Sequence, residues 1–378
     1  MSSYSSTGES YGSDEPPELD LDLVKLMERA GEVLNARCTA ARKLTRGASH
    51  EVFTLEFQEM PDMAPPPLLI RAGLSCIARF SRLNGTRERS VSEMATARCL
   101  KHLTSIPVPE IYYHDLDPDN DVGAPFVLME MMPGRHLYKI WDDLPLDSKK
   151  SALSQIASVI AQLASLKFNQ IGSLDENDGI GPLISPCFED PKGPFPSTSE
   201  FMRAFLPSPT SAESPTLTDP FEQARAAIDQ FLAHNTQAYP QPPFCLIHAD
   251  FDAQNMLFLD HGSGPKLTGL IDFEYSFTGP LYFLYDYPIF IQDVSWSAEL
   301  YAENAVLRAH FVRAIYSALP NAETHYVQDL EDGTGLAYEG RPDYVHERYS
   351  ETAELLPPDV GTDAPESHAK SVSAVGGG

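Results

Sequence analysis

The sequence predicts an α+β protein of two lobes, in which a small β-rich lobe comes first and a larger, mainly helical lobe follows. Short apolar runs bounded by turn residues occupy the first third of the chain, which is typical of strands. Residues 148–168 and 301–319 instead place apolar side chains at helical spacing. The chain has 378 residues, 42% of them hydrophobic, which is enough to bury a large core divided between two lobes.

Changes of composition divide the chain into segments. Residues 1–17 are Ser, Tyr, Gly and acidic residues with almost no aliphatic side chains, and we expect a disordered acidic tail. Residues 18–133 form the predicted N-lobe, which ends at a Pro-Gly pair typical of a strand exit. The predicted C-lobe runs over residues 134–355. Residues 356–378, rich in Ser, Gly, Ala and acids, form a second predicted disordered tail.

The chain is strongly acidic, with 54 Asp and Glu against 27 Lys and Arg and a net charge of −27. This charge argues against DNA, RNA or an anionic membrane as a partner. The five cysteines are odd in number and no Cys-x-x-Cys occurs, so we expect neither a zinc site nor a disulfide framework, and a reducing compartment fits. No basic and apolar leader is visible, and we expect a cytoplasmic protein. The sequence does not predict the oligomeric state.

Residues 244–274 concentrate the polar groups that could carry chemistry. His248 and Asp250 follow a short apolar run, and Asn255 comes five residues after Asp250. A strand-like run, a turn of Asp, Gly and Pro, and a second strand then lead to Asp272. This order, H-x-D-x-x-x-x-N followed by a strand and Asp, is the kinase catalytic loop and metal-binding Asp in outline.

The spacing of these groups suits phosphoryl transfer, in which concentrated negative charge must be neutralised. Mg²⁺ prefers hard oxygen ligands, usually one or two carboxylates together with phosphates and water. The Asp272 carboxylate and the Asn255 amide oxygen fit that role. Asp250 is the candidate to accept the proton of an attacking hydroxyl and to orient it. The alternative is a buried His248 with capping or turn acids in an ordinary αβ domain.

The residues His248-Ala249-Asp250, Asn255 and Ile271-Asp272-Phe273-Glu274 resemble the aminoglycoside phosphotransferase family, which also contains choline kinase-like and fructosamine kinase-like enzymes. The family usually writes these regions H-G-D-L-H-x-x-N and I-D-W/F-E. This chain departs from the pattern at positions 249, 251 and 252, where it has Ala, Phe and Asp. None of these changes removes a group that the chemistry needs. The resemblance covers about 44–319 and implies a protein-kinase-like two-lobe fold.

The resemblance extends to a strand and a helix of the N-lobe. Ile77-Ala78-Arg79-Phe80 is similar to the family's V-A-R-I strand, which implies that Arg79 holds the α- and β-phosphates of the nucleotide in a fork. Glu93 lies in a segment similar to the family's S-E-x-A-T-x-R-x-L helix and would anchor Arg79. Arg71, at the end of a neighbouring apolar run, is the rival. An ordinary surface Arg at a strand end is the plain alternative.

Two further segments are expected to contact the nucleotide. Gly47 and Ser49 lie in a turn of small residues, where backbone N–H groups can approach phosphates, although an ordinary hairpin has the same composition. The strand at 125–132 looks like the connector between the lobes. Backbone groups around Glu130 and Met132 would hydrogen-bond the adenine there, and a buried edge strand is the alternative.

The function implied by the resemblance is ATP- and Mg²⁺-dependent transfer of the γ-phosphoryl group to a hydroxyl of a small molecule. The N-lobe would bind the nucleotide and the C-lobe the acceptor, while His248 orders the catalytic loop. A catalytically silent, kinase-shaped binding module is the main alternative, but it has no reason to keep Asp250, Asn255 and Asp272 together. A protein kinase is disfavoured because Asp-Phe-Glu stands where D-F-G would be, and no A-P-E segment follows soon after.

The charge of the acceptor is a separate question. Asp252 and Glu274 would face the acceptor side, with Asp286 and Asp293 close in sequence, and such a cleft would attract a cationic amine. The alternative is that these acids are solvated or bonded to backbone N–H groups in a chain that is acidic throughout. The sequence leaves both hypotheses open.

Overall fold

The computed structural model describes residues 18–46, 50–58, 75–82, 86–205, 223, 226–227, 229–230, 242–262, 264–284, 287–292 and 298–319. The chain forms two compact units, residues 1–205 with 237–340 and residues 206–236 with 341–378. All helices and strands discussed below belong to the first unit. The predicted tails lie outside the described residues, and the lobe boundaries at 133 and 355 stay predictions.

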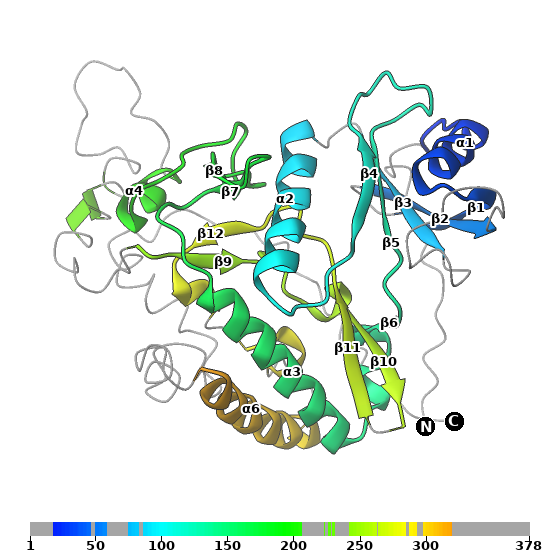
Figure 1. Ribbon diagram of the computed structural model, residues 1–378. Helices are drawn as coiled ribbons and strands as arrows, with labels where there is room; N and C mark the ends of the chain where they lie inside the picture. The colour runs from blue at the N-terminus through cyan, green and yellow to red at the C-terminus, as the bar shows by residue number, and fades with distance from the viewer. Residues whose placement is uncertain are drawn as a thin grey trace, which may run out of the picture. The chain divides into compact units, whose positions relative to one another are not determined.

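The N-terminal part of the first unit is a five-stranded antiparallel sheet in the order β1-β2-β3-β5-β4 (Figure 1). The strands are β1 (Arg37–Arg46), β2 (His50–Gln58), β3 (Cys76–Ser81), β4 (Ile111–Asp115) and β5 (Phe126–Glu130). Side chains alternate between the two faces of a strand. In β3 this alternation buries Ala78 and Phe80 in the core and leaves Ile77 and Arg79 on the opposite face.

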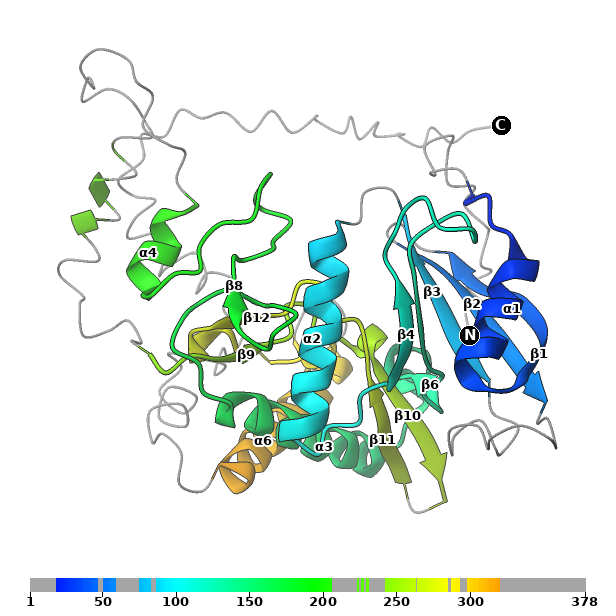
Figure 2. The same ribbon diagram turned by 45° about the horizontal axis from the view of Figure 1, so that its top comes forward.

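Helix α1 (Leu23–Leu34) covers the core face of this sheet (Figure 2). Its buried residues Leu26, Ala30 and Leu34 recur at helical spacing and pack with apolar side chains of the strands. The Asp22 carboxylate caps the helix by accepting from the first backbone N–H groups. The helix therefore closes one face and leaves the other free to line a site.

Helix α2 (Arg87–Leu103) contacts two hydrophobic cores. The hydroxyl of Thr86 caps its start by accepting from the Arg89 N–H. Met94 packs with Val127 of the sheet, whereas Leu100 joins the core of the helical lobe. The helix thus fixes the sheet against the rest of the unit.

The C-terminal part is built around two long helices, α3 (Leu146–Ser165) and α6 (Ala298–Ala318), which pack against each other (Figure 1). Three small sheets accompany them, in the orders β11-β10-β6, β12-β9 and β7-β8. Their strands are β6 (Arg135–His136), β7 (Ser173–Leu174), β8 (Ile180–Gly181), β9 (Cys245–Ile247), β10 (Met256–His261), β11 (Gly264–Leu270) and β12 (Phe277–Gly279). The described elements confirm the predicted α+β, two-lobe fold.

The remaining elements are short. Helix α4 (Thr198–Arg203) lies between the short strands β7 and β8 and the described residues 242–262. The 3-10 turns are η1 (Leu137–Lys139), η2 (Trp141–Asp143), η3 (Ala253–Asn255), η4 (Leu281–Leu284) and η5 (Ile289–Ile291).

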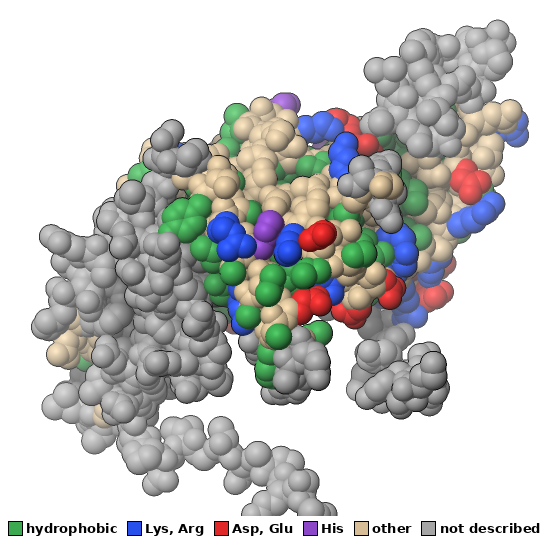
Figure 3. Space-filling model, turned by 90° about the horizontal axis from the view of Figure 1, so that it is seen from below, with side chains coloured by type: hydrophobic (Ala, Val, Ile, Leu, Met, Phe, Trp, Pro, Cys, Tyr) green, Lys and Arg blue, Asp and Glu red, His purple; other side chains and the backbone are tan. Residues whose placement is uncertain are grey.

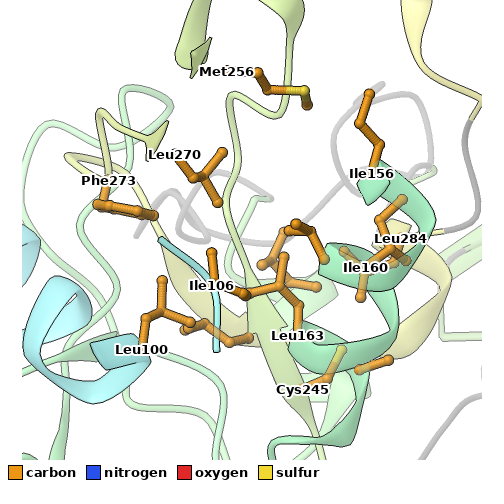
Figure 4. Close-up of a cluster of buried hydrophobic side chains, with 14 of the residues drawn as sticks. Leu100, Ile106, Ile156, Ile160, Leu163, Cys245, Met256, Leu270, Phe273 and Leu284 are labelled. Carbon is orange, nitrogen blue, oxygen red and sulfur yellow. The ribbon is translucent and has the colours of Figure 1, made fainter. Parts of the chain in front are cut away.

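The core of the C-terminal part anchors the segments that carry the motif (Figure 4). Ile156, Ile160 and Leu163 of α3 belong to the same buried cluster as Cys245 at the start of β9. Met256, Leu270 and Phe273 bury the ends of the strands next to the motif residues in the same cluster. Because truncating one of these side chains to Ala costs about 2–5 kcal/mol, the cluster holds the motif on a rigid support.

The chain crosses from β5 to the β10–β11 hairpin through Gly134. This residue has a φ of 119°, and a Cβ there would lie 2.8 Å from the Phe258 carbonyl oxygen. Only glycine combines that backbone conformation with that close approach. β6 follows at once and pairs with β10, with His136 opposite Leu257.

The surface seen from below mixes basic, acidic and apolar side chains (Figure 3). The acidity of the chain therefore does not gather into a single field on this face. All five cysteines are free thiols. Among the described helices, none has the length and apolar character needed to cross a membrane.

Candidate functional site

A cavity of about 1020 Å³ lies between the sheet and the β10–β11 hairpin. Its apolar walls come from both sides, with Val52 and Ile77 from the sheet and Leu257 and Ile271 from the hairpin region. Arg79, Glu93, Glu130, Met132, Asn255 and Asp272, all predicted site residues, line it as well. Ligand sites of this kind are mostly apolar with a few convergent polar groups.

The connector leaves backbone groups exposed to this cavity. Glu130 is already occupied, because its N–H donates to the Glu110 carbonyl and its carboxylate accepts from the Glu110 N–H. In the described part of the chain, the backbone groups of Met131 and Met132 form no hydrogen bond. Unpaired backbone groups at a cavity wall are suited to bind a flat polar ring. Of the residues predicted to contact the adenine, Glu130 therefore has its N–H occupied, whereas Met132 and its neighbour Met131 do not, and the contact itself stays a prediction.

Arg79 lies at the centre of the polar end of the cavity. Its Nη1 donates to Glu93 Oε1, and its Nη2 donates to Asp272 Oδ1 at 2.8 Å and to His50 Nδ1 at 3.1 Å. Burial opposes the positive charge, but the carboxylates of Glu93 and Asp272 outweigh it and raise the pKa of Arg79. The structure thus brings together the predicted strand cation, the helix Glu and the candidate metal ligand.

Glu274 forms a second layer behind these groups. Its Oε2 lies 3.5 Å from Arg89 Nε, 3.9 Å from Arg79 Nη2 and 3.7 Å from His50 Nε2. Burial and the neighbouring Asp272 raise its pKa. Arg89 is held in turn by the Tyr275 hydroxyl at 2.8 Å. The expectation that Glu274 faces the acceptor side is therefore wrong, because its carboxylate turns toward the arginines of β3 and α2.

The catalytic-loop residues form a compact set of hydrogen bonds. Asn255 Nδ2 donates to the Asp250 carbonyl at 2.9 Å and to Asp250 Oδ2 at 2.8 Å. Gln254 Nε2 donates to the same carboxylate oxygen at 3.1 Å. A flipped Asn255 amide would set its oxygen against these oxygens, so the network assigns the amide orientation. It leaves Asn255 Oδ1 as the atom that remains to bind another group.

His248 is buried, and its Nε2 lies 3.0 Å from the Ile271 carbonyl oxygen, one residue before Asp272. Its ring contacts Phe273 at 4.9 Å between centroids, and burial lowers its pKa. The Ser276 hydroxyl donates to its carbonyl. These contacts tie the loop of Asp250 to the loop of Asp272. His248 is not among the residues that line the cavity, which fits the expected ordering role.

Two residues of the motif have left-handed backbone. Ala249 has a φ of 66° and Asp272 a φ of 69°. This region costs an L-residue such as Ala about 1–2 kcal/mol, whereas Asp tolerates it better. The Asp272 carboxylate is 34% exposed and reaches Arg79 from this conformation. Local strain of this kind is held in place by the buried core beneath it.

A divalent metal ion and a nucleotide fit these residues. Asn255 Oδ1 and the partly exposed Asp272 carboxylate are hard oxygen donors on one cavity wall. Within the described ranges, no group of three or more His, Cys, Asp or Glu side chains is arranged to hold a metal ion. Two protein ligands are the number expected for Mg²⁺ that takes its other ligands from phosphates and water.

Several predicted residues lie outside the described part of the chain. Gly47 and Ser49 of the turn, the rival Arg71, and the acids Asp286 and Asp293 all fall there. Asp252, which is described, caps η3 by accepting from the Ala253 N–H at 2.7 Å. That contact agrees with the alternative hypothesis, in which these acids are bonded to backbone N–H groups.

Sequence reasoning missed several residues that the structure brings to the site. His50 and Arg89 complete the network around Arg79, and Gln254 helps to hold Asp250. The position of Gln254 directly before Asn255 could have indicated that it lies at the site. No sequence pattern indicated His50 or Arg89, because their partners are distant in the chain.

We expect Arg79→Lys to weaken Mg·ATP binding by about tenfold. A lysine ammonium keeps the charge but is a single point, and it cannot reach Glu93, Asp272 and His50 at once. Titration calorimetry with Mg·ATP measures the loss. Arg71→Lys is the matched control and should bind as the unchanged protein does. The opposite ranking of the two variants would show that Arg71 is the phosphate ligand.

Comparisons with known proteins place the chain in a family. The model of the phosphotransferase enzyme family matches residues 69–338. A subtelomeric hrmA-associated cluster protein of Aspergillus fumigatus is 29% identical over 139 residues, which are 36% of this chain and 25% of that protein. Altered inheritance of mitochondria protein 9 of Zygosaccharomyces rouxii is 36% identical over 94 residues, 23% of this chain and 15% of that protein. The matches span a quarter or less of these relatives.

A solved structure supports the fold. A Ralstonia eutropha protein assigned as an aminoglycoside phosphotransferase superposes with a TM-score of 0.52 at 14% identity, covering 89% of this chain and 97% of its own. This likeness confirms the protein-kinase-like two-lobe fold. Because the family model extends over well more than half of the chain, including every described motif residue, this chain belongs to the phosphotransferase enzyme family.

Proposed function

We propose that this protein is a kinase of small molecules, which transfers the γ-phosphoryl group of ATP to a hydroxyl in the presence of Mg²⁺. The observation that carries the proposal is that the predicted site residues from both lobes meet at one end of the cavity. Arg79 of β3, Glu93 of α2 and Asp272 of the hairpin exit meet in one network at the polar end of the cavity. Asp250 and Asn255 form the adjoining network of the catalytic loop.

Each residue has a role that its contacts support. Arg79 binds nucleotide phosphate, and Glu93 holds the guanidinium in place. Asn255 Oδ1 and Asp272 hold the metal ion, which supplies neutralisation of the phosphate charge when bound. Asn255 and Gln254 fix the Asp250 carboxylate through Oδ2. Among the described residues nothing bonds Asp250 Oδ1, which therefore remains to orient the acceptor hydroxyl and take its proton.

The experiment is an ATP-consumption assay on a panel of hydroxyl-bearing metabolites, with and without Mg²⁺. We expect at least one acceptor to give a phosphorylated product by mass spectrometry and no product without the divalent ion. Asp250→Asn serves as the inactive control. Tight Mg·ATP binding without turnover on a broad panel would favour the second candidate, a silent binding module. Phosphorylation of proteins alone would favour a protein kinase instead.

The same panel of metabolites also tests whether the acceptor is cationic. Asp252 is bonded to backbone and Glu274 faces arginines, so neither described acid supports a cationic acceptor. We therefore favour a neutral acceptor. Amino-sugar, choline-like and polyol acceptors are compared at low and high salt. A preference for amines that weakens with salt would restore the cationic hypothesis.

A nucleotide and a small hydroxyl compound are thus the partners that we propose. A cytoplasmic location, and the exclusion of nucleic-acid polymers and membranes, rest on composition and stay predictions.

A further inference from the structure

His50 is a partly buried histidine at the polar end of the cavity, and the proposed reaction has not used it. It is the first residue of β2, directly after residues 47–49, and its side chain is 13% exposed. It lines the cavity together with Arg79 and Glu274. Its surroundings are polar, and packing alone does not explain it.

The contacts of His50 fix its tautomer. Its Nδ1 lies 3.1 Å from Arg79 Nη2, and an arginine has only donors, so Nδ1 accepts and carries no proton. The ring is neutral, so its proton then sits on Nε2. That nitrogen lies 3.7 Å from Glu274 Oε2, which is beyond hydrogen-bond distance. This oxygen is buried and has no hydrogen-bond partner of its own in the described residues.

The guanidinium of Arg79 is therefore held from three segments. Glu93 of α2 holds Nη1, while Asp272 and His50 share the hydrogens of Nη2. His50 is the neutral partner among these, and it is the one that comes from the β1–β2 hairpin. Without it, the second Nη2 hydrogen would turn to the nearest carboxylates, Asp272 and Glu274. An Asp272 carboxylate that accepted two hydrogen bonds from Arg79 would be a poorer ligand for a metal ion.

We propose that His50 is a positioning residue, which in its Nε2-protonated form holds the Arg79 guanidinium and joins it to the β1–β2 hairpin. This inference rests on the proposed function, because it takes Arg79 to be the phosphate ligand. His50 touches neither phosphate nor acceptor in this assignment. It acts on nucleotide affinity through Arg79, and the chemical step is left to Asp250.

The first test uses two replacements with opposite properties. His50→Asn keeps an acceptor at the position of Nδ1, whereas His50→Leu keeps the volume and removes every polar atom. We expect His50→Leu to raise KM for Mg·ATP about tenfold with little change in kcat, the scale of one lost hydrogen bond to a charged group. His50→Asn should restore most of the affinity. A packing role would give the reverse order, with Leu better than Asn, and would overturn the proposal.

The second test does not depend on activity. In ¹⁵N-labelled protein, the imidazole signals of His50 are assigned by their loss in His50→Asn, with His102→Asn as a control at an exposed histidine. We expect the Nε2-protonated tautomer at neutral pH. A Nδ1-protonated or charged ring would overturn the link. If the tautomer is as expected but Mg·ATP does not bind the unchanged protein, the proposed function fails and the contact between His50 and Arg79 stands.

Discussion

Asp272→Ala is expected to abolish measurable Mg·ATP binding while the protein stays folded. The carboxylate is the charged member of the two-ligand set, and Asn255 alone offers one neutral oxygen. Its loss also removes a partner of Arg79, whose guanidinium would turn to Glu93 and Glu274. Titration calorimetry in the presence and absence of Mg²⁺ measures the effect.

Two further variants make the Asp272 result specific. Asp272→Asn keeps a residue that tolerates the left-handed backbone, so it separates loss of charge from loss of local conformation. Asp147→Asn removes a carboxylate that is 96% exposed and that, in the described part of the chain, pairs with Lys150, and this variant should bind Mg·ATP normally. Unchanged Mg·ATP affinity in Asp272→Ala would remove Asp272 from the metal site.

Asp250→Asn is expected to lower kcat by a factor of about 10² or more, with nucleotide affinity nearly preserved. The amide cannot take a proton from the acceptor. With its oxygen in the place of Oδ2, where it still accepts from Asn255 and Gln254, its N–H₂ group stands where Oδ1 would meet the acceptor hydroxyl. Steady-state kinetics on the best acceptor, together with calorimetry, separates turnover from binding.

The neighbouring acid is the matched control for Asp250. Asp252→Asn retains a good cap for η3, since Asn and Asp are equivalent there. We expect it to keep normal turnover on a neutral acceptor. Full turnover in Asp250→Asn would exclude Asp250 from the mechanism, whereas a selective loss for amines in Asp252→Asn would show that Asp252 meets the acceptor.

The sequence predicted the parts of the site that follow from local order. Asp250 and Asn255 lie five residues apart in one loop, so their contact depends on local conformation. In β3, alternation places Arg79 on the face of the sheet opposite to the one on which Ala78 is buried. The apolar run around Arg79 predicted this orientation. The Glu93 partner required the family pattern, because a glutamate on a helix is most often solvated.

Other parts of the site depend on contacts that no local pattern contains. Arg79 reaches Asp272 across 193 positions of sequence, and Arg89 reaches Tyr275 across 186. Glu274 was assigned to the wrong side because its direction is set by these arginines and by the turn at Asp272. His50 was invisible for the same reason, since a histidine after a turn has no distinguishing periodicity.

The bond between Arg79 and Asp272 has a consequence for the order in which ligands enter. A carboxylate that is already paired with a guanidinium attracts a free divalent cation only weakly, and its neighbour Asn255 adds no charge. A bound nucleotide would bring phosphates that give Arg79 new partners in place of Asp272, so that one ion pair would be exchanged for another. Asp272 would then be available to a metal ion once the phosphates are in place. We expect the resting protein to ignore Mg²⁺ alone and to load metal and nucleotide as one complex.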